Sequence, residues 1–164
     1  MKTHEEYMEL ALEEARKAEE IDEVPVGCVI VCGGEVISRG HNLKEQLNQA
    51  YAHAEMMAIQ KAAEVKRNWC LNDCDLYVTL EPCMMCTGII NLSRIRTVYY
   101  GTTDPKGGCL ETVIDLKKIN RLNHYPNIVG NILQKECSEI LTNYFRKKRE
   151  IIKEKKKKNK ANIQ

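Results

Sequence analysis

Apolar residues recur along this chain in two periods, one typical of helices and one typical of strands. Within the first twenty residues they are spaced by three and four positions, which is the period of an amphipathic helix. Thr3 and Glu6 stand three residues apart ahead of them, a capping-box pattern that favours a helix start. The sequence therefore predicts an N-terminal helix with an apolar side made of Met8, Ala11, Leu12, Ala15 and Ala18.

A β-hairpin is predicted next along the chain. The segments Val26 to Cys32 and Glu35 to Arg39 both have strand composition. Gly33-Gly34 between them suits the two-residue turns that join antiparallel strands. We therefore expect an antiparallel pair of strands after the first helix.

Helix and strand patterns alternate through the rest of the chain. Residues 52–65 are rich in strong helix formers, and residues 75–79 and 98–101 have strand composition. Pro82 is well placed in the first turn of a further helix, and a last helix is expected from about Lys135. This order of elements predicts a layered α/β domain.

Length and composition are those of one domain. The chain has 164 residues, 43% of them hydrophobic, which is enough for one core and too few for two. We assign residues 1–150 to a single domain and residues 151–164 to a lysine-rich, frayed tail. The longest apolar stretch, Val24 to Cys32, is about half as long as a membrane helix requires, so no membrane segment is expected. The charged N-terminal residues lack the apolar stretch of a secretory signal, and we expect a cytoplasmic protein whose eight cysteines are reduced.

Positive charge is concentrated at the C-terminus. Residues 146–164 carry ten Lys or Arg and two Glu, a net charge of +8, which leaves −6 for residues 1–145 out of a total of +2. Such a run can neutralise several phosphates of a nucleic acid, and it can equally be a solvated tail that keeps the protein soluble.

Two short motifs carry the candidate chemistry. His53 and Glu55 form H-x-E, and Cys83 and Cys86 form P-C-x-x-C about thirty residues later. Structural zinc takes four protein ligands, whereas catalytic zinc takes three and keeps one position for water. Zinc on one His and two Cys would lower the pKa of that water far below its usual value, toward about 7, and Glu55 would carry the protons. The combination predicts a hydrolytic zinc centre, and each motif alone is much less specific.

The predicted helices allow these four side chains to share one pocket. Cys83 and Cys86 would lie on one face of a helix that opens at Pro82, whose positive end favours thiolates. His53 and Glu55, two residues apart, can converge only at a helix end, which is where the sequence places them. Four other cysteines could supply a fourth ligand and close the site: Cys28 and Cys32, and Cys70 and Cys74 in a loop. We expect all four to be core or surface residues instead.

Longer segments surround these motifs: Val24 to Gly27, Gly40 to Asn42, Tyr77 to Cys86 and Asp104 to Gly108. Together with His53-Ala54-Glu55 they closely resemble the bacterial tRNA-specific adenosine deaminases, and the similarity extends from the first helix to about Arg149. H-x-E with P-C-x-x-C marks the wider cytidine deaminase-like superfamily. The resemblance implies a three-layer α/β cytidine deaminase-like fold, with a central mixed sheet of about five strands flanked by helices.

The same resemblance implies a reaction and its partners. The implied reaction is the deamination of adenosine to inosine at the wobble position (34) of a tRNA, which is expected to be tRNA-Arg. The implied enzyme is a homodimer with one zinc ion per subunit. A base inside a stacked RNA cannot reach such a site, whereas an anticodon loop can present an unstacked one. The residues expected to contact the RNA are Asn42, Asp104, Lys106, Asn123 and His124, with Phe145 and Arg149 on the last helix.

Several of these residues have a local alternative. Asn42 and Asp104 are also typical turn residues, and Phe145 can anchor the last helix by its apolar ring. The sequence departs from the family at His41, where an aromatic is familiar, and at residues 111–113, where small residues are usual. Both departures concern the RNA groove and leave the zinc ligands unchanged.

Two other functions remain open at this point. One is a deaminase of the same fold that acts on cytosine, guanine or a free nucleoside, which would need no basic helix. The other is a non-catalytic zinc module, in which Glu55 would be dispensable and a fourth protein ligand would be present.

Overall fold

The computed structural model describes residues 1–163 of the chain. Its elements, in chain order, are α1 (His4–Glu20), β1 (Gly27–Cys32), β2 (Glu35–His41), α2 (Lys44–Leu47), α3 (Ala54–Lys66), β3 (Cys74–Leu80), α4 (Met84–Leu92), β4 (Thr97–Thr102), the 3₁₀ turn η1 (Leu116–Lys118), β5 (Asn127–Val129) and α5 (Gln134–Ala161).

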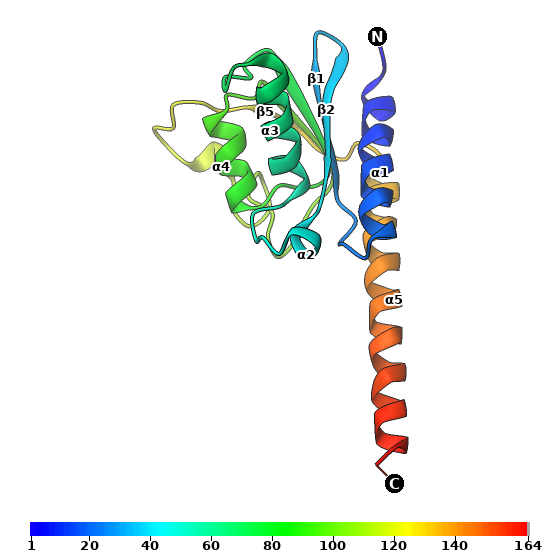
Figure 1. The fold of residues 1–164 in the computed structure, drawn as a ribbon. Coiled ribbons are helices and arrows are strands. Elements are labelled where there is room, and N and C mark those ends of the chain that lie inside the picture. The colour runs from blue at the N-terminus through cyan, green and yellow to red at the C-terminus, as the bar shows by residue number, and fades with distance from the viewer. Residues whose placement is uncertain (164) are drawn as a thin grey trace.

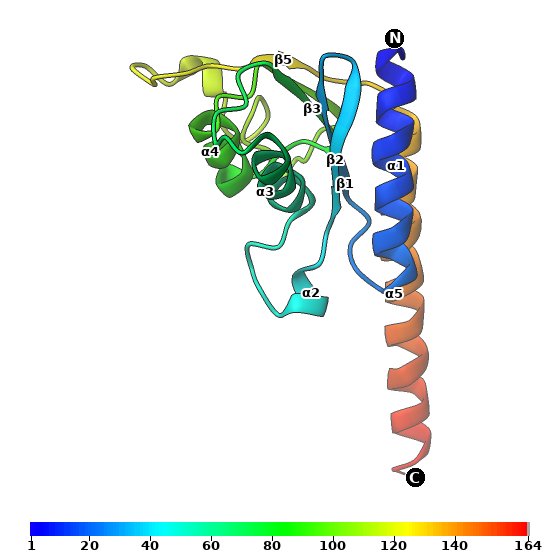
Figure 2. The same ribbon diagram turned by 45° about the horizontal axis from the view of Figure 1, so that its top comes forward.

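A five-stranded mixed sheet in the order β2-β1-β3-β4-β5 forms the middle layer. β1 pairs antiparallel with β2 and β3, whereas β3, β4 and β5 run parallel. Helices α1 and α5 cover one face, and α3 and α4 cover the other (Figures 1 and 2). The expected three-layer fold with a mixed sheet is therefore confirmed.

Alternation along the strands supplies a core to each face of the sheet. On β1, Ile30 packs into the core that includes Ala58 of α3, while its neighbour Val29 packs into the core that includes Met8 of α1. Successive strand residues point to opposite faces, so each central strand is apolar on both sides.

The predicted N-terminal helix and hairpin are present. The Thr3 hydroxyl accepts a hydrogen bond from the Glu6 N–H, and the Glu6 carboxylate accepts one from the Thr3 N–H, which completes the capping box. Gly33 and Gly34 both have positive φ, as a two-residue hairpin turn requires.

Other boundaries differ from the predicted ones. Helix α4 begins at Met84 with Cys83 as its N-cap, so Pro82 precedes the helix and is not part of its first turn. Cys74, which we placed in a loop, is the buried first residue of β3 because it pairs there with Cys32 of β1. Short elements such as α2 and β5 escaped prediction because three or four residues are too few to show a period.

Helix α5 continues to Ala161, although the sequence suggested a frayed segment from residue 151. Lys and Glu are strong helix formers, and this stretch contains no Gly or Pro to end the helix. Residues 150–161 are all exposed, and the end of α5 projects beyond the rest of the molecule (Figure 1). The division between domain and tail at residue 150 stays a prediction.

Across residues 1–163, no helix combines the length and the apolar character that crossing a membrane requires.

Candidate active site

Three predicted metal ligands meet at one point of the structure. The imidazole Nδ1 of His53 lies 3.6 Å from the Sγ atoms of both Cys83 and Cys86. A tetrahedral zinc site with ordinary Zn–S and Zn–N bonds separates its sulfur and nitrogen ligands by about 3.5 Å. Since all three ligand atoms also lie within 4.8 Å of one another, the donor set fits a zinc ion.

Two helix starts hold these ligands. His53 is the N-cap of α3 and Cys83 is the N-cap of α4, and both have extended backbone conformations. Neither side chain caps its own helix by a hydrogen bond, so both are free to bind a metal. Cys86 lies in the first turn of α4, where the positive end of the helix stabilises a thiolate. The two motifs thus meet at the starts of two helices.

The two thiols share their protons unequally in this arrangement. The hydrogen bond from Cys86, assisted by His53, lowers the pKa of Cys83 to about 4 in spite of its burial. The neighbouring Cys83 thiolate and burial raise the pKa of Cys86 well above its usual value. A thiolate is thus favoured even without a cation, which is the state that zinc binds.

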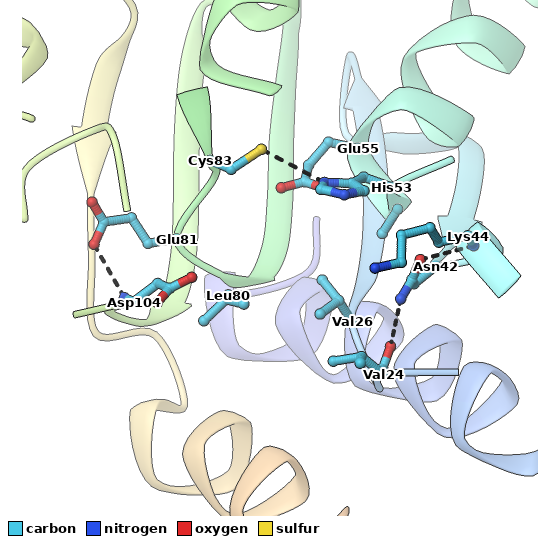
Figure 3. A pocket seen from close by; sticks show the side chains of 11 residues that line it. Val24, Val26, Asn42, Lys44, His53, Glu55, Leu80, Glu81, Cys83 and Asp104 are labelled. Atoms are coloured by element: carbon cyan, nitrogen blue, oxygen red, sulfur yellow. Dashed lines mark hydrogen bonds between the residues drawn. The ribbon is translucent and has the colours of Figure 1, made fainter. Parts of the chain in front are cut away.

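Glu55 lies beside the ligand cluster and is only 4% exposed. It occupies the first turn of α3, and Figure 3 shows its carboxylate next to the imidazole of His53. Burial is the largest influence on this carboxyl group, and it raises its pKa to about 7. The side chain is therefore placed to exchange protons with a group bound at the cluster.

A cavity of about 180 Å³ opens onto the cluster. It is smaller than the sites of drug-sized ligands, which start at about 300 Å³, so it suits one planar base better than a whole nucleotide. Figure 3 shows the side chains around it. Its lining residues are Val24, Val26, Asn42, Lys44, His53, Ala54, Glu55, Leu80, Glu81, Cys83 and Asp104.

Glu81 fixes the loop on one side of this cavity. Its carboxylate is 1% exposed and accepts hydrogen bonds from the main-chain N–H groups of Leu110 (3.2 Å), Glu111 (3.0 Å) and Thr112 (3.1 Å), and from the Thr112 hydroxyl. Burial raises its pKa, but these hydrogen bonds outweigh burial and leave the pKa below its usual value. A side chain at Gly108 would collide with the Glu81 carboxylate, since a Cβ there would lie 2.4 Å from Cδ.

Asn42 and Asp104 line the cavity and also order their own loops. Asn42 donates to the Val24 carbonyl (3.2 Å) and accepts from the Lys44 N–H (3.1 Å). Asp104 accepts from the N–H groups of Lys106 (3.1 Å) and Gly107 (3.2 Å). The turn role that the sequence left open is therefore present in both cases, alongside a position at the cavity.

A groove adjoins the cavity and contains three more of the predicted RNA contacts. Val24, Leu80 and Asp104 line both spaces, and the groove extends from them to helix α5. Lys106, Phe145 and Arg149 line its other parts. Phe145 is 43% exposed, so its ring is available at the surface.

Asn123 and His124 lie elsewhere. His124 is hydrogen bonded through Nε2 to the carbonyl of Ile95 (2.6 Å), which precedes β4, whereas Asp104 follows β4. Six strand residues separate the two ends by about 20 Å. Within one chain, the structure does not bring Asn123 and His124 to the cavity.

Two features of this region escaped the sequence analysis. Lys44 of α2 extends over the cavity and supplies positive charge among the carboxylates of Glu55, Glu81 and Asp104 (Figure 3). The position of Lys44 two residues after Asn42 could have indicated this role. The orientation of its side chain depends on α2, however, and that helix was not predicted. Glu81 was noticed only as part of a motif, because its partners lie about thirty residues away.

The other cysteines lie outside this ligand cluster. Among residues 1–163, the only metal-ligand cluster that contains His53 consists of His53, Cys83 and Cys86. A fourth cysteine ligand, which would have closed the site, is thus absent from the described part of the chain.

Comparison with known proteins gives consistent results. Residues 1–102 match the model of the cytidine and deoxycytidylate deaminase zinc-binding region. The chain is 47% identical over 143 residues to the tRNA-specific adenosine deaminase of Bacillus subtilis, covering 87% of this chain and 89% of the relative. It is 46% identical over 148 residues to the enzyme of that name from Agrobacterium fabrum, covering 90% and 96% of the two chains.

A solved structure is similar to the same extent. It comes from work described as studies of A-to-I editing by tRNA:A34 deaminases at the wobble position of transfer RNA. The TM-score is 0.80 at 46% sequence identity, and the match covers 83% of this chain and 99% of the other.

Proposed function

We propose that this chain, which belongs to the zinc-binding cytidine and deoxycytidylate deaminase family and to its tRNA-specific adenosine deaminase branch, converts the adenosine at wobble position 34 of tRNA-Arg to inosine. The observation that carries the proposal is the three-ligand cluster, with buried Glu55 beside it, at the base of a cavity sized for one base. The similarity to an A34 deaminase structure supports the choice of position.

The chain's own residues divide the chemistry between them. His53, Cys83 and Cys86 would hold one zinc ion per subunit at this site, and the ion supplies Lewis-acid activation of water when it is bound. Glu55 has no ligand role, so its carboxylate accepts the proton from the attacking water and delivers it to the ring nitrogen of adenine. It then takes the proton of the new C6 hydroxyl and passes it to the amino group, so that ammonia leaves as the C6 carbonyl of inosine forms.

The shape of the site selects a base that has left its stack. A cavity of about 180 Å³ cannot admit a base pair, so the target adenosine has to be flipped out of the RNA. The adjoining groove, with Phe145 beside Arg149 and Lys106, offers an aromatic surface and cations for the neighbouring nucleotides. Asn42 and Asp104 border the base itself. An anticodon loop provides this arrangement of unpaired nucleotides.

Helix α5 supplies positive charge to the same side of the molecule. Tyr144 donates a hydrogen bond to the Asp22 carbonyl (3.2 Å), and Lys148 bonds to the Asp22 carboxylate (2.7 Å). These contacts hold α5 next to the segment that leads to Val24 at the cavity. The Arg and Lys residues of α5 are thereby positioned to meet phosphates of the bound RNA.

A second copy of the chain covers the outer face of α3 and α4 in this proposal. Met84, Leu92 and Trp69 are large apolar residues exposed by 67%, 66% and 65%, and they line two adjacent apolar depressions there. Contiguous exposed apolar surface of this kind marks interaction sites. In such a homodimer, Asn123 and His124 would reach RNA from the subunit that does not hold the reacting base.

Light scattering tests the dimer. Leu92→Glu should shift the protein from dimer to monomer, because it places a charge in the apolar face. Ile152→Glu, which changes an equally apolar residue on the exposed part of α5, should leave the dimer intact.

The activity is tested with two tRNA transcripts and three small molecules. We propose a cytoplasmic location, so the assay uses a reducing buffer. The purified protein is incubated with a tRNA-Arg transcript bearing A34, with the same transcript bearing G34, and with free adenosine, cytidine and guanine. Sequencing should show inosine at position 34 of the first transcript alone. Ammonia release from free nucleosides or bases without editing of the tRNA would instead identify a small-molecule deaminase.

A further inference from the structure

A second group of potential metal ligands lies at the opposite end of β3 from the active site. Cys32 ends β1, Cys74 begins β3, and the two residues are directly paired across these strands. Asp73 precedes Cys74, and its carboxylate accepts hydrogen bonds from both thiols, at 3.4 Å from Cys32 and 3.5 Å from Cys74. One ligand atom from each of these residues lies within 4.8 Å of the other two.

These separations match those between ligands of one zinc ion. With Zn–S near 2.3 Å and Zn–O near 2.0 Å, tetrahedral geometry separates sulfur and oxygen by about 3.5 Å. The two sulfur–oxygen distances, each to a different oxygen of the Asp73 carboxylate, therefore resemble the sulfur–nitrogen distances of 3.6 Å at His53. Among residues 1–163, only these two groups bring three such ligand atoms together.

The backbone holds this second group in place before any ion binds. Cys32 and Cys74 are fixed by the register of two central strands, and Cys74 is fully buried. Asp73 is half exposed, which leaves one side of the group open to an entering ion. Two thiolates and a carboxylate form a donor set that prefers a soft or borderline cation such as Zn²⁺.

Lys66 provides charge compensation. Its ammonium group contacts the Asp73 carboxylate and lies 3.6 Å from the sulfur of Cys32. Without a metal, one carboxylate and one ammonium balance each other. With Zn²⁺ bound, two thiolates and the carboxylate contribute −3, the ion contributes +2 and Lys66 contributes +1, so the site is again neutral. Binding requires only that the two thiols release their protons.

We propose that Cys32, Cys74 and Asp73 form a second, non-catalytic zinc site that joins the end of β1 to the start of β3. The site lies about 20 Å from the active site along β3, too far to take part in the reaction. Its role is structural, because its ligands link two strands at the point where they pair, and the proposal does not depend on which base the enzyme deaminates.

Zinc content measured by elemental analysis tests the proposal. After dialysis against metal-free buffer, the wild-type protein should retain about two zinc ions per chain. Cys32→Ser and Asp73→Asn should each retain one, His53→Ala should retain one, and the Cys32→Ser/His53→Ala double variant should retain none. Cys70→Ser is the matched control, since this cysteine lies outside both groups, and it should retain two.

Two further measurements distinguish this site from the active site and from a disulfide. Cys32→Ser and Asp73→Asn should keep full tRNA deamination, and circular dichroism should show that they are folded. One zinc ion per wild-type chain, or an unchanged zinc content in both variants, would overturn the proposal. A wild-type mass lower by two hydrogen atoms under non-reducing conditions, lost in Cys32→Ser, would overturn it in favour of a disulfide between Cys32 and Cys74.

Discussion

The two ends of β3 each carry a pair of thiols, yet only one end is equipped for chemistry. α3 and β3 both connect these ends: α3 follows its N-cap His53 and ends at Lys66, while β3 begins at Cys74 and leads to Glu81 and Cys83. At the His53 end, two helix N-termini, a cavity and the buried Glu55 surround the ligands. At the Cys32 end, the ligands have Lys66 as their neighbour. Donor atoms alone therefore do not make a reactive centre; a spare carboxylate and space for a base do.

Removal of the Glu55 carboxylate is the strongest test of this difference between the two ends of β3. Glu55→Ala should lower the rate of inosine formation by about 10³-fold, because the proton carrier is lost, while the zinc content stays unchanged. Glu64→Ala changes an exposed glutamate on the same helix and should have no effect. If Glu55→Ala lost zinc as His53→Ala does, Glu55 would be a ligand and the division of roles would be wrong.

The next largest effect is expected at Glu81, which holds the loop beside the cavity. Glu81→Gln should lower the free energy of unfolding by about 3 kcal/mol, because an amide cannot accept all of the hydrogen bonds that converge on the buried carboxylate. Urea denaturation measures this change. Glu111→Gln is the control, since its carboxylate accepts from the Tyr100 hydroxyl (2.9 Å) at the exposed edge of the loop, and about 1 kcal/mol is expected. Equal losses in the two variants would remove the special role of Glu81.

A smaller effect is expected on the affinity for tRNA when the lysines at the end of α5 are removed. Ending the chain after Glu150 keeps the contacts of Tyr144 and Lys148 with Asp22 but removes six lysines. Affinity for tRNA should fall about tenfold, and its dependence on salt should become shallower, since fewer phosphates are neutralised. Filter binding at several salt concentrations measures both, and full-length protein with these lysines changed to Gln should behave like the shortened chain. Unchanged affinity and salt dependence would exclude the tail from RNA binding.

Local sequence signals predicted the parts of the site that depend on local structure. The N-cap position of His53 follows from the helix composition after it, and the spacing of Cys83 and Cys86 follows from one helical turn. The capping box at Thr3 and the turn at Gly33-Gly34 are similarly local. Each of these features is decided by residues fewer than five positions apart, which is why the sequence alone revealed them.

Features that depend on distant pairing were not predictable in the same way. The partnership of Cys32 with Cys74 requires the β1–β3 register, and that of Glu81 with Thr112 requires a loop to fold back over β3. The apolar face around Leu92 is scattered over several segments of the sequence. Sequence periodicity reports on one element at a time, so contacts between elements remained hidden.

The projecting half of α5 also separates two properties that evolution can change independently. Residues 150–161 are exposed on all sides, so substitutions there alter neither the cores on the two faces of the sheet nor the ligand cluster. In the RNA-binding role proposed for α5, gain or loss of single lysines in this segment would change how long a nucleic acid stays bound, with little cost in folding and no change in the chemical step. The residues at the catalytic end of β3 can stay unchanged while the sequence of this part of the helix changes. Related chains could then differ in their affinity for RNA and still catalyse the same reaction.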